Sequence, residues 1–568
     1  MLITAITIEN FKGIQKPVRV ELKPITLFFG PNSAGKSTII QAMHYAHEIF
    51  ERKNLNPDQT LLGGNAIDLG GFESMVNGHD KTKSIKISFD LDLQKSSLPD
   101  YSDIDEEGFF GTGYLEFSSD DLADAVRRMT SAVVQVTVTW SDLLKKAYVS
   151  EYSVSANGEK LVSIVSSEDT KQIYISELNN RNPIFFEESY EKYEEDVQAM
   201  VKKHLKNLSP EAFAQLLEKS KDTKSDVDID WKSNKNRSLN DRILIGSNEK
   251  VPVNQSSALP NWGTKLSIGW ELKLHDEVFG KEDDIRINRD LRYSSLITGP
   301  GELVRNELAK LCYIGPIRSI PPRGYRPFSS PSSLNRWADG LAAYDVLLNS
   351  DEPFLDNVNS WMANKDRLFS GYRVEVKKYR EISDEHPLMK TILQDQILDE
   401  DVNLRDLLSI PLQRRLLIRD EARDIELSPH DIGVGISQVL PVVVAALHRK
   451  SGVVVIEQPE LHIHPAFQVA LGDLFIEQIR QRPGLTFILE THSEHLMLRF
   501  LRRIRETAET GENKAPENLT LVPEDLSINF LETGNNGISC TQIRVDEDGD
   551  FIDRWPQGFF AERAGELF

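Results

Sequence analysis

The sequence predicts an α/β fold. Three observations support this prediction. The apolar run Ile25–Phe29 leads into a glycine-rich loop and then into a helical pattern. A second apolar run, Val453–Ile456, ends in an acidic residue, Glu457. From about residue 290, helix-like and strand-like runs alternate to the C-terminus, as in a sheet that is covered by helices.

Composition and charge limit the classes of protein that this chain can represent. It has 568 residues, of which 40% are hydrophobic and 27% are charged, close to the globular norm. Lys and Arg number 66 and Asp and Glu number 88, which gives a net charge of −22. The chain therefore cannot bind nucleic acids or acidic membranes as a general polycation, and only a local basic surface could do so.

The cysteines and the apolar runs predict a location. Two cysteines, Cys312 and Cys540, cannot form a disulfide framework, which favours a reducing compartment. The N-terminal residues MLITAITIENFKG lack the basic and apolar segments of a signal peptide. The longest apolar stretch, Val439–Leu447, is far shorter than the roughly 18 residues of a membrane-spanning helix. We therefore expect a cytoplasmic protein that does not enter a membrane.

The order of these patterns divides the chain into three predicted parts. Several short β-like runs between about residues 84 and 176, with turn signals such as Asn157-Gly158, indicate an antiparallel meander. A polar stretch follows that begins with helical patches (Tyr193–Leu217), and it is either a partner-binding arm or a solvated excursion. We expect an N-terminal lobe over residues 1–178, a helical arm and polar connector over 179–295, and a C-terminal lobe over 296–568.

The strongest motif is GPNSAGKS, which starts at Gly30 and has the full G-x-x-x-x-G-K-[ST] pattern of a P-loop. The glycines let backbone N–H groups wrap around phosphates, and the start of the following helix adds positive potential. Lys36 would reach the β- and γ-phosphates of ATP, and the Ser37 hydroxyl would bind Mg²⁺. The residues predicted to bind the nucleotide here are Gly30, Pro31, Asn32, Ser33, Ala34, Gly35, Lys36, Ser37 and Thr38.

Glu457, at the end of its apolar strand, has the position of a Walker B acid, which holds Mg²⁺ through the water shell of the ion. The run that follows it, QPELHIHP, contains Gln458 and a second acid, Glu460. The two histidines of this run, His462 and His464, could instead indicate a zinc site. A spacing of two residues without a nearby third ligand is weak support for that alternative.

Two further segments complete the set of motifs. The segment DIGVGISQ, which ends at Gln438, precedes an apolar run, and its glycines and serine predict a helix start that could bind an anion. A plain capped helix is the alternative. His492 follows the apolar strand Thr486–Leu489 and could contact a γ-phosphate or be a structural histidine.

In this order the motifs resemble the ABC-type ATPase heads of the RecF, structural-maintenance-of-chromosomes (SMC) and overcoming-lysogenization-defect (OLD) families. ITIENFKGIQKPVRVELKPITLFFGPNSAGKSTIIQAM is similar to their first lobe, VGISQ to their signature motif, IEQPELHIHP to their Walker B and D-loop, and ETHSEHL to their switch-histidine segment. IGPIRSIPPRGY and RWPQGFFAERAGELF resemble bacterial AAA-family ATPases that include anti-phage defence subunits of the Septu (PtuA) type, which are paired with an HNH nuclease.

The resemblance implies an ABC-type P-loop ATPase head assembled from both chain ends, with an antiparallel β subdomain and a helical insertion. Two such heads would enclose two ATP molecules with Mg²⁺, so we expect a homodimer or a higher oligomer. By the same likeness, Gly435, Ser437 and Gln438 would close on the ATP of the partner, and His492 would be the γ-phosphate switch. The Q-loop glutamine of these families has no clear match in this sequence.

This sequence departs from the family pattern at two positions. The signature is VGISQ instead of Leu-Ser-Gly-Gly-Gln, so its serine lies two places later. Gln458 replaces the carboxylate that orients the attacking water, and an amide can orient water but accepts a proton poorly. We therefore count Glu457, Gln458, Glu460 and His492 as the catalytic candidates, with Glu460 as the nearest substitute acid, and we expect slow hydrolysis.

Three functions agree with the resemblance. The first is a dimeric ATPase that controls a separate nuclease or other effector in anti-phage defence and senses DNA. The second is a DNA repair or recombination ATPase similar to RecF. The third, an OLD-like nuclease in the same chain, is disfavoured because the acidic run near Asp546 is typical of a hairpin turn. DNA contact could use a row of arginines on one helix, although such rows are more often solvated or ion-paired; its members are Arg499, Arg502, Arg503 and Arg505.

Overall fold

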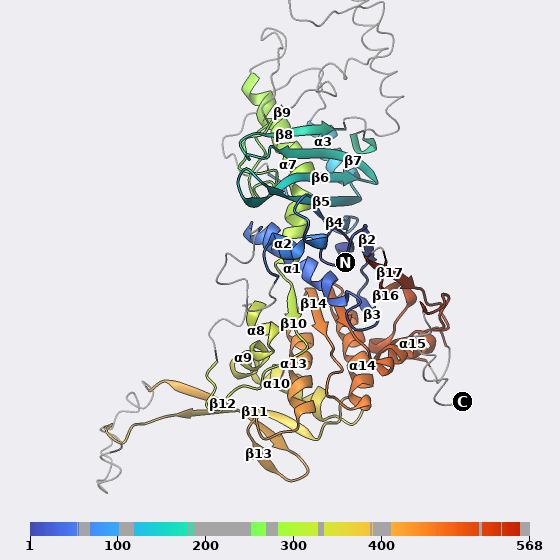
Figure 1. Cartoon of the computed structure of the whole chain (residues 1–568). Coiled ribbons are helices and arrows are strands. Elements are labelled where there is room, and N and C mark those ends of the chain that lie inside the picture. Colours follow the sequence, from blue (N-terminus) through green and yellow to red (C-terminus); the bar gives the residue numbers. More distant parts are fainter. Residues whose placement is uncertain are drawn as a thin grey trace, which may run out of the picture. The chain divides into compact units, whose positions relative to one another are not determined.

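The structure is a computed structural model that describes residues 1–53, 55, 69–101, 119–179, 182–185, 251–268, 282–327, 334–386, 389, 410–509, 514–535 and 537–556. The chain divides into two compact units (Figure 1). The first unit contains residue 1, residues 11–78 and residues 307–568, and the second contains residues 2–10 and 79–306. The boundaries predicted at residues 178 and 295, and the helical arm between them, stay predictions because most of that segment lies outside the described residues.

The first unit is built on a six-stranded sheet in which the N-terminal strand β3 lies between two strands from the C-terminal half. β3 is parallel to both neighbours, β15 and β16, and only the edge strand β17 runs antiparallel. In order across the sheet, the strands are β10 (Cys312–Ile314), β14 (Gly452–Glu457), β15 (Leu485–Glu490), β3 (Ile25–Phe29), β16 (Leu526–Gly534) and β17 (Gly537–Ile543). This sheet confirms the predicted α/β fold and its assembly from both chain ends.

Helices next to the parallel strands in the sequence cover this sheet (Figure 1). The longest ones are α1 (Lys36–Arg52), α13 (Val434–His448), α14 (Pro465–Gln481) and α15 (Glu494–Ala508). Every second residue of β3 (Ile25, Leu27 and Phe29) packs in one core with α13 and α14. The shorter elements of this unit are β2 (Val18–Glu21), α2 (Phe72–Met75), α8 (Leu334–Ala338), α9 (Leu341–Asn349), α10 (Glu352–Ala363), and the 3₁₀ turns η5 (Glu517–Leu519) and η6 (Pro523–Asp525).

Helix α13 is the apolar run that the sequence placed after VGISQ. Its residues from Val439 to Leu447 are buried, as expected for a helix that is apolar on all sides. Pro441 lies about two turns inside the helix. A proline there cannot donate to the carbonyl of Ser437, and the Tyr344 hydroxyl donates to that carbonyl instead (3.4 Å).

A separate three-stranded antiparallel sheet also belongs to the first unit. It consists of β11 (Tyr372–Arg380), β12 (Leu412–Asp420) and β13 (Ile425–Leu427). Its inner face is buried through Val374, Leu416 and Ile418, which join the core of the unit. The opposite face is exposed over much of its length.

The second unit confirms the predicted antiparallel β subdomain. Its strands pair in the order β1 (Ile3–Glu9), β4 (Ile85–Asp92), β5 (Ser131–Ser141), β6 (Lys146–Ala156), β7 (Glu159–Ser166), β8 (Ile173–Leu178) and β9 (Val251–Pro252). Asn157 and Gly158 both have positive φ angles (47° and 88°), as a two-residue hairpin turn between β6 and β7 requires. The other elements of the chain are α3 (Ser119–Arg128), α7 (Glu282–Leu308), η2 (Asn77–His79) and η4 (Pro183–Phe185).

The helical patch predicted at Tyr193–Leu217 lies outside the described residues, so the helical insertion is not tested there. None of the helices in the described part of the chain is both long enough and apolar enough to cross a membrane.

Candidate ATP and magnesium site

The P-loop connects β3 to α1 and has the backbone conformation that the glycine pattern predicts. Gly30 and Gly35 have φ angles of 143° and 92°, which side chains rarely allow, and Ser33 between them has a φ of 63°. A Cβ atom on Gly30 would lie 2.1 Å from the carbonyl oxygen of Leu531 on the neighbouring strand. Only glycine fits there, so the loop can approach the sheet closely and turn its N–H groups toward a phosphate.

Lys36 is held inside this loop. Its side chain is buried, and its Nζ donates hydrogen bonds to the carbonyl oxygens of Gly30 and Pro31, both at 3.0 Å. Burial lowers the pKa of Lys36, and the nearby carboxylates of Glu490 and Glu460 oppose that shift. The loop therefore holds an ammonium group where the β- and γ-phosphates of a nucleotide would lie.

Two acidic residues end neighbouring strands next to the P-loop. Glu457 of β14 and Glu490 of β15 are register partners, and Glu490 also pairs with Phe28 of β3. Both carboxyl groups are buried, with 8% and 5% of each residue exposed. Ser37 Oγ donates to Glu490 Oε2 (2.8 Å), and the Tyr313 hydroxyl donates to Glu457 Oε1 (3.0 Å). The structure thus brings the predicted Ser37 and Glu457 together with an acid that the sequence analysis missed.

Glu490 could have been found by the same criterion as Glu457, because each ends an apolar strand. The motif ETHSEHL directed attention to its histidine and left the first residue without a role. Parallel strands end at the same edge of a sheet, so the two acids had to lie close together once β14 and β15 were known to be neighbours.

The two carboxyl groups disfavour each other's ionisation. Burial and the neighbouring Glu490 raise the pKa of Glu457 to about 7, and burial also raises the pKa of Glu490. A divalent cation would remove this penalty, and Mg²⁺ prefers the carboxylate and hydroxyl oxygens that Glu457, Glu490 and Ser37 present. The residues therefore fit the Mg²⁺ ion that the motifs imply.

The zinc alternative finds no support in the same region. His464 Nδ1 accepts the N–H of Ala466 (3.2 Å) and caps the start of α14. In the described part of the chain, no group of three or more His, Cys, Asp or Glu residues could hold a metal ion. Mg²⁺ does not need such a group, because it keeps several water ligands and takes others from phosphates.

Glu460 is engaged in a structural role. Its Oε1 accepts the backbone N–H of His492 (2.7 Å), and its Oε2 accepts the Thr491 hydroxyl (2.8 Å). Burial raises the pKa of this carboxyl group, and these hydrogen bonds act against the shift. Glu460 therefore positions the segment that carries His492, and both of its oxygens already have partners. This geometry does not favour Glu460 as a substitute for the missing catalytic acid.

Gln458 and His492 are the two predicted catalytic residues whose side chains keep polar atoms without a hydrogen-bond partner among the described residues. Gln458 has a left-handed backbone (φ 46°), and its N–H donates to the carbonyl oxygen of Glu490 (2.7 Å). His492 Nε2 is buried and has no hydrogen-bond partner among the described residues. Burial and the positive charge of Lys36 lower the pKa of His492, so the ring is neutral at pH 7. A neutral ring with an unpartnered Nε2 is suited to donate to a γ-phosphate oxygen.

The signature segment forms the start of α13, and the structure divides its residues between surface and interior. Gly433 and Val434 are exposed and Gly435 is half-buried, whereas Ser437 and Gln438 are buried within their own unit. They lie one turn into the helix, as the late position of the serine in VGISQ implied. Of the three residues predicted to contact the ATP of a partner, only Gly435 lies at the surface in this structure.

Arg318 holds this segment against the Walker B strand, and the sequence analysis gave it no role. Its buried guanidinium donates to the carbonyl oxygens of Glu457 (2.8 Å), Gln458 (3.1 Å) and Gln438 (3.4 Å). Gln438 Nε2 donates in return to the carbonyl oxygen of Arg318 (2.7 Å). A Cβ on Gly435 would lie 2.9 Å from the carbonyl oxygen of His462. The absence of a side chain at Gly435 therefore lets the start of α13 lie close to the backbone of His462.

The arginine row on α15 is ion-paired. Arg499 and Arg503 contact Asp473, Arg502 contacts Glu506, and Arg505 contacts Asp550. These pairs favour the alternative that such rows are structural. The acidic run 546–550 forms a tight turn in which the Asp546 N–H donates to the Asp550 carbonyl (3.0 Å), as the hairpin interpretation predicted.

Comparisons with protein families assign the class. Residues 1–259 match the family described as "AAA ATPase domain", and residues 326–498 match "AAA domain, putative AbiEii toxin, Type IV TA system". The first match contains the P-loop, and the second contains the signature segment, Glu457 and His492. The chain is therefore a P-loop ATPase. The two AAA-type stretches contribute β3, β14 and β15 to the same six-stranded sheet, and residues 521–568 match "Protein of unknown function (DUF3696)".

Solved structures of SMC heads are similar over nearly the whole length. The SMC head bound to the C-winged helix domain of ScpA has 9% identity and a TM-score of 0.36, with 96% of this chain and 98% of that chain covered. The SMC head domain from Thermotoga maritima has 9% identity and a TM-score of 0.32, with 96% and 100% covered. Scores this low carry no argument about function. No curated protein sequence matches the chain.

The buried acid pair predicts a pH-dependent stability. Because the pKa of Glu457 is raised to about 7 in the folded state, the folded protein binds a proton more tightly than the unfolded chain and loses stability as the pH rises from about 4.5 to 7. Glu457→Gln removes this loss. It should raise the melting temperature of the nucleotide-free and Mg²⁺-free protein by a few degrees at pH 8, equivalent to about 1–2 kcal/mol.

The same variant should have little effect at pH 5, where Glu457 is already protonated, and Glu490→Gln should act in the same direction. Differential scanning fluorimetry at the two pH values measures both effects. A lower melting temperature for Glu457→Gln at pH 8 would contradict the electrostatic interpretation of the acid pair.

Proposed function

We propose that this chain is the ATPase subunit of a cytoplasmic anti-phage defence system. It works as a homodimer or higher oligomer of heads, senses DNA, and controls a separate nuclease or other effector, of which the HNH type is the first candidate. The observation that carries the ATP-dependent part is the cluster of buried Lys36, Glu457 and Glu490 with half-buried Ser37 and His492. The resemblance to Septu-type (PtuA) ATPases supports the defence role.

A DNA repair or recombination ATPase similar to RecF is the second candidate, since it would use the same head. Phage plating separates the two. In cells that carry this gene with its neighbouring genes, defence predicts fewer plaques, and loss of that protection with Lys36→Ala. Sensitivity to DNA damage without any effect on plaque number would favour the repair role.

The geometry supports a division of labour at the nucleotide. Lys36 would exchange the carbonyls of Gly30 and Pro31 for phosphate oxygens, and His492 would donate its Nε2–H to the γ-phosphate. Mg²⁺, when bound, supplies charge neutralisation at the phosphates, and Ser37, Glu457 and Glu490 are the residues that would hold it or its water ligands. Gln458 would orient the attacking water through its amide without taking its proton.

The exposed start of α13 supports a site that two chains complete. Gly433, Val434 and Gly435 present the N–H groups of a helix N-terminus at the surface, where an anion binds favourably. In the proposed dimer, these groups close on the γ-phosphate that the partner holds, so dimerisation depends on ATP.

We expect Lys36→Ala to lower the affinity for ATP–Mg²⁺ by about 100-fold, because a charge-assisted contact to phosphate is worth roughly 3 kcal/mol. Isothermal titration calorimetry measures the affinity. Lys310→Ala, which removes an exposed lysine paired with Glu307, is the matched control and should leave it unchanged. An unchanged affinity in Lys36→Ala would show that nucleotide binds elsewhere.

We expect ATP–Mg²⁺ to convert the protein to a dimer or larger assembly, and Val434→Glu to prevent this by placing a negative charge opposite the phosphates. Val434 is 51% exposed, so the variant should fold and keep its affinity for ATP. Leu498→Glu, at a residue that is 43% exposed on α15, is the control. Multi-angle light scattering at micromolar protein measures the mass, and a monomer under all conditions would contradict the shared site.

We expect turnover well below the enzyme median of ~10 s⁻¹, because Gln458 accepts a proton poorly. Gln458→Glu should raise kcat at least tenfold with little change in KM, since it adds a base without changing nucleotide contacts. Steady-state phosphate release measures both constants. A wild-type rate already near the median, with no gain from Gln458→Glu, would exclude a slow, long-lived ATP state.

A further inference from the structure

In the three-stranded sheet of the first unit, positively charged residues lie opposite each other on neighbouring strands. In the register of β11 and β12, Lys377 lies opposite Arg415 and Lys378 lies opposite Arg414. Like charges that face each other across two strands destabilise a sheet. Arg414 donates to the carbonyl oxygen of Leu348 (2.6 Å), so its charge is already compensated. The Lys377–Arg415 pair is therefore the one that costs stability, and a bound anion would remove that cost.

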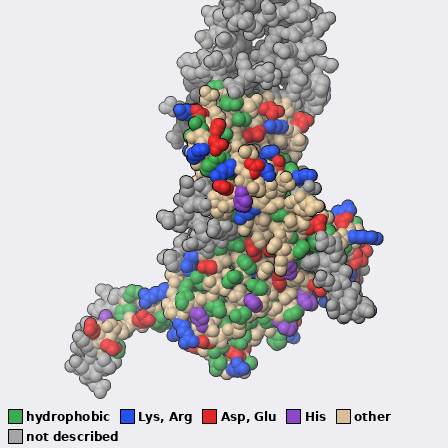
Figure 2. Space-filling model, viewed as in Figure 1, with side chains coloured by type: hydrophobic (Ala, Val, Ile, Leu, Met, Phe, Trp, Pro, Cys, Tyr) green, Lys and Arg blue, Asp and Glu red, His purple; other side chains and the backbone are tan. Residues whose placement is uncertain are grey.

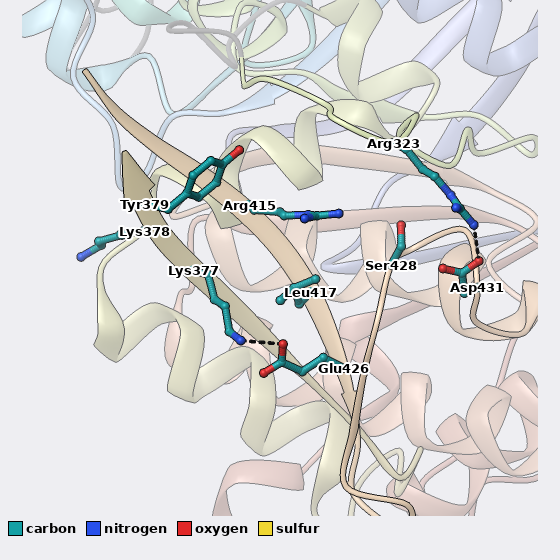
Figure 3. Close-up of a pocket in the computed structure, with 9 residues that line it drawn as sticks. All are labelled: Arg323, Lys377, Lys378, Tyr379, Arg415, Leu417, Glu426, Ser428 and Asp431. Atoms are coloured by element: carbon teal, nitrogen blue, oxygen red, sulfur yellow. Dashed lines mark hydrogen bonds and ion pairs between the residues drawn. The ribbon is translucent and has the colours of Figure 1, made fainter. Parts of the chain in front are cut away.

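These strands line a groove of about 600 Å³ (Figure 3). Figure 3 shows Arg323 reaching the groove from another segment of the chain and contacting Asp431, while Arg415 points along it from β12. In Figure 2, Lys and Arg side chains gather near the base of the β11–β12 hairpin. The groove is lined by Arg323, Lys377, Lys378, Tyr379, Arg415, Leu417, Glu426, Ser428 and Asp431.

The groove carries four cations and two acids. Lys377 pairs with Glu426 and Arg323 with Asp431, but Arg323 and Lys377 are more than half exposed, so these pairs are weak. Lys378 and Arg415 are exposed and form no ion pair within the described residues. A local excess of positive charge on a chain with a net charge of −22 is the kind of local basic surface that the composition demands of any polyanion contact.

We propose that this groove, formed by the outer face of β11–β13 with Arg323, binds the sugar-phosphate backbone of a nucleic acid. A row of lysines and arginines matches regularly spaced phosphates, and arginine can bind a phosphate through two N–H groups. The ring of Tyr379 is 39% exposed beside these cations and provides a surface on which an unpaired base can stack. An acidic protein segment has charge but no base, so Tyr379 favours nucleic acid.

The groove is connected directly to the signature segment. The Asp431 N–H donates to the carbonyl of Ser428 (2.8 Å), and Asp431 precedes Gly433, the N-cap of α13, by two residues. A phosphate that drew Arg323 away from Asp431 would act on the segment that leads into this helix. This inference rests on the proposed function, specifically on DNA sensing. It assigns DNA contact to this groove and not to the arginine row on α15.

Fluorescence anisotropy with the full-length protein tests the proposal, using a labelled single-stranded oligonucleotide and the duplex of the same sequence at several salt concentrations. The double variant Lys377→Glu/Arg415→Glu, at two facing cations of the groove, should raise the Kd at least tenfold and reduce the slope of log K against log salt by about 2. The double variant Arg502→Glu/Arg505→Glu, which changes two exposed arginines on α15, is the charge-matched control and should have a much smaller effect.

Three outcomes would overturn the proposal. They are no binding by the wild-type chain at low salt, equal affinities for the groove variant and the α15 control variant, and competition by polyglutamate as effective as that by unlabelled oligonucleotide. Tighter binding of the single strand than of the duplex would support the stacking role of Tyr379, and Tyr379→Ala should remove that difference. Calorimetry with ATP on the same samples checks that the variants are folded. A failure of the wild type to bind ATP would contradict the proposed function without changing the anisotropy results.

Discussion

The parallel pairing of β3 with β15 is the constraint on which the nucleotide site depends. It places the P-loop, at residues 30–37, beside the ends of two strands that follow more than 400 residues later. The hydrogen bond from Ser37 to Glu490 joins residues 453 positions apart in the chain. A site of this kind exists only when both chain ends have folded into one sheet, so binding of nucleotide stabilises the whole first unit and not one lobe.

The site concentrates features that are costly without a ligand. Glu457 and Glu490 are adjacent buried acids, His492 has a buried ring nitrogen without a partner among the described residues, and Gln458 holds a left-handed backbone. Each feature lowers the stability of the nucleotide-free protein by an amount of order 1–3 kcal/mol. Such costs persist where the surrounding structure fixes them, as the fully buried strands β14 and β15 do here. The same features are complementary to a nucleotide with its metal ion.

The sequence predicted the parts of this site that depend on local pattern. The glycine spacing, the strand before it and the helix after it determine the P-loop conformation, because φ angles at Gly30 and Gly35 are a local property. The acid at Glu457 followed from its strand. The likeness to ABC-type heads supplied the assembly from both ends, which no local pattern contains.

What could not be predicted depended on which strands and loops become neighbours. Glu490 gains its role only because β15 lies between β14 and β3. The engagement of Glu460 with the backbone of His492 depends on how a loop returns to that strand. The basic groove depends on the register that sets Lys377 against Arg415, which lies 38 residues later in the sequence. By contrast, the arginines of α15 are close in sequence and conspicuous, but the acids that neutralise them come partly from α14, through Asp473, and from a distant turn.

Arg318 physically links the start of α13 to the end of β14. Burial lowers its pKa only to about 10, so its guanidinium stays charged. It bonds mainly to carbonyl oxygens, which fixes the backbone of α13 and the end of β14 relative to each other. Arg318 therefore ties the start of α13 to the end of the strand that carries Glu457. If a partner's phosphate binds at Gly433, or a nucleic acid acts on Asp431 at the basic groove, as we propose, the contact would be linked to Glu457 through the buried side chain of Arg318. Coupling of this kind needs no long pathway, because the groove, the signature segment and the Walker B acid are separated by one helix start and one arginine.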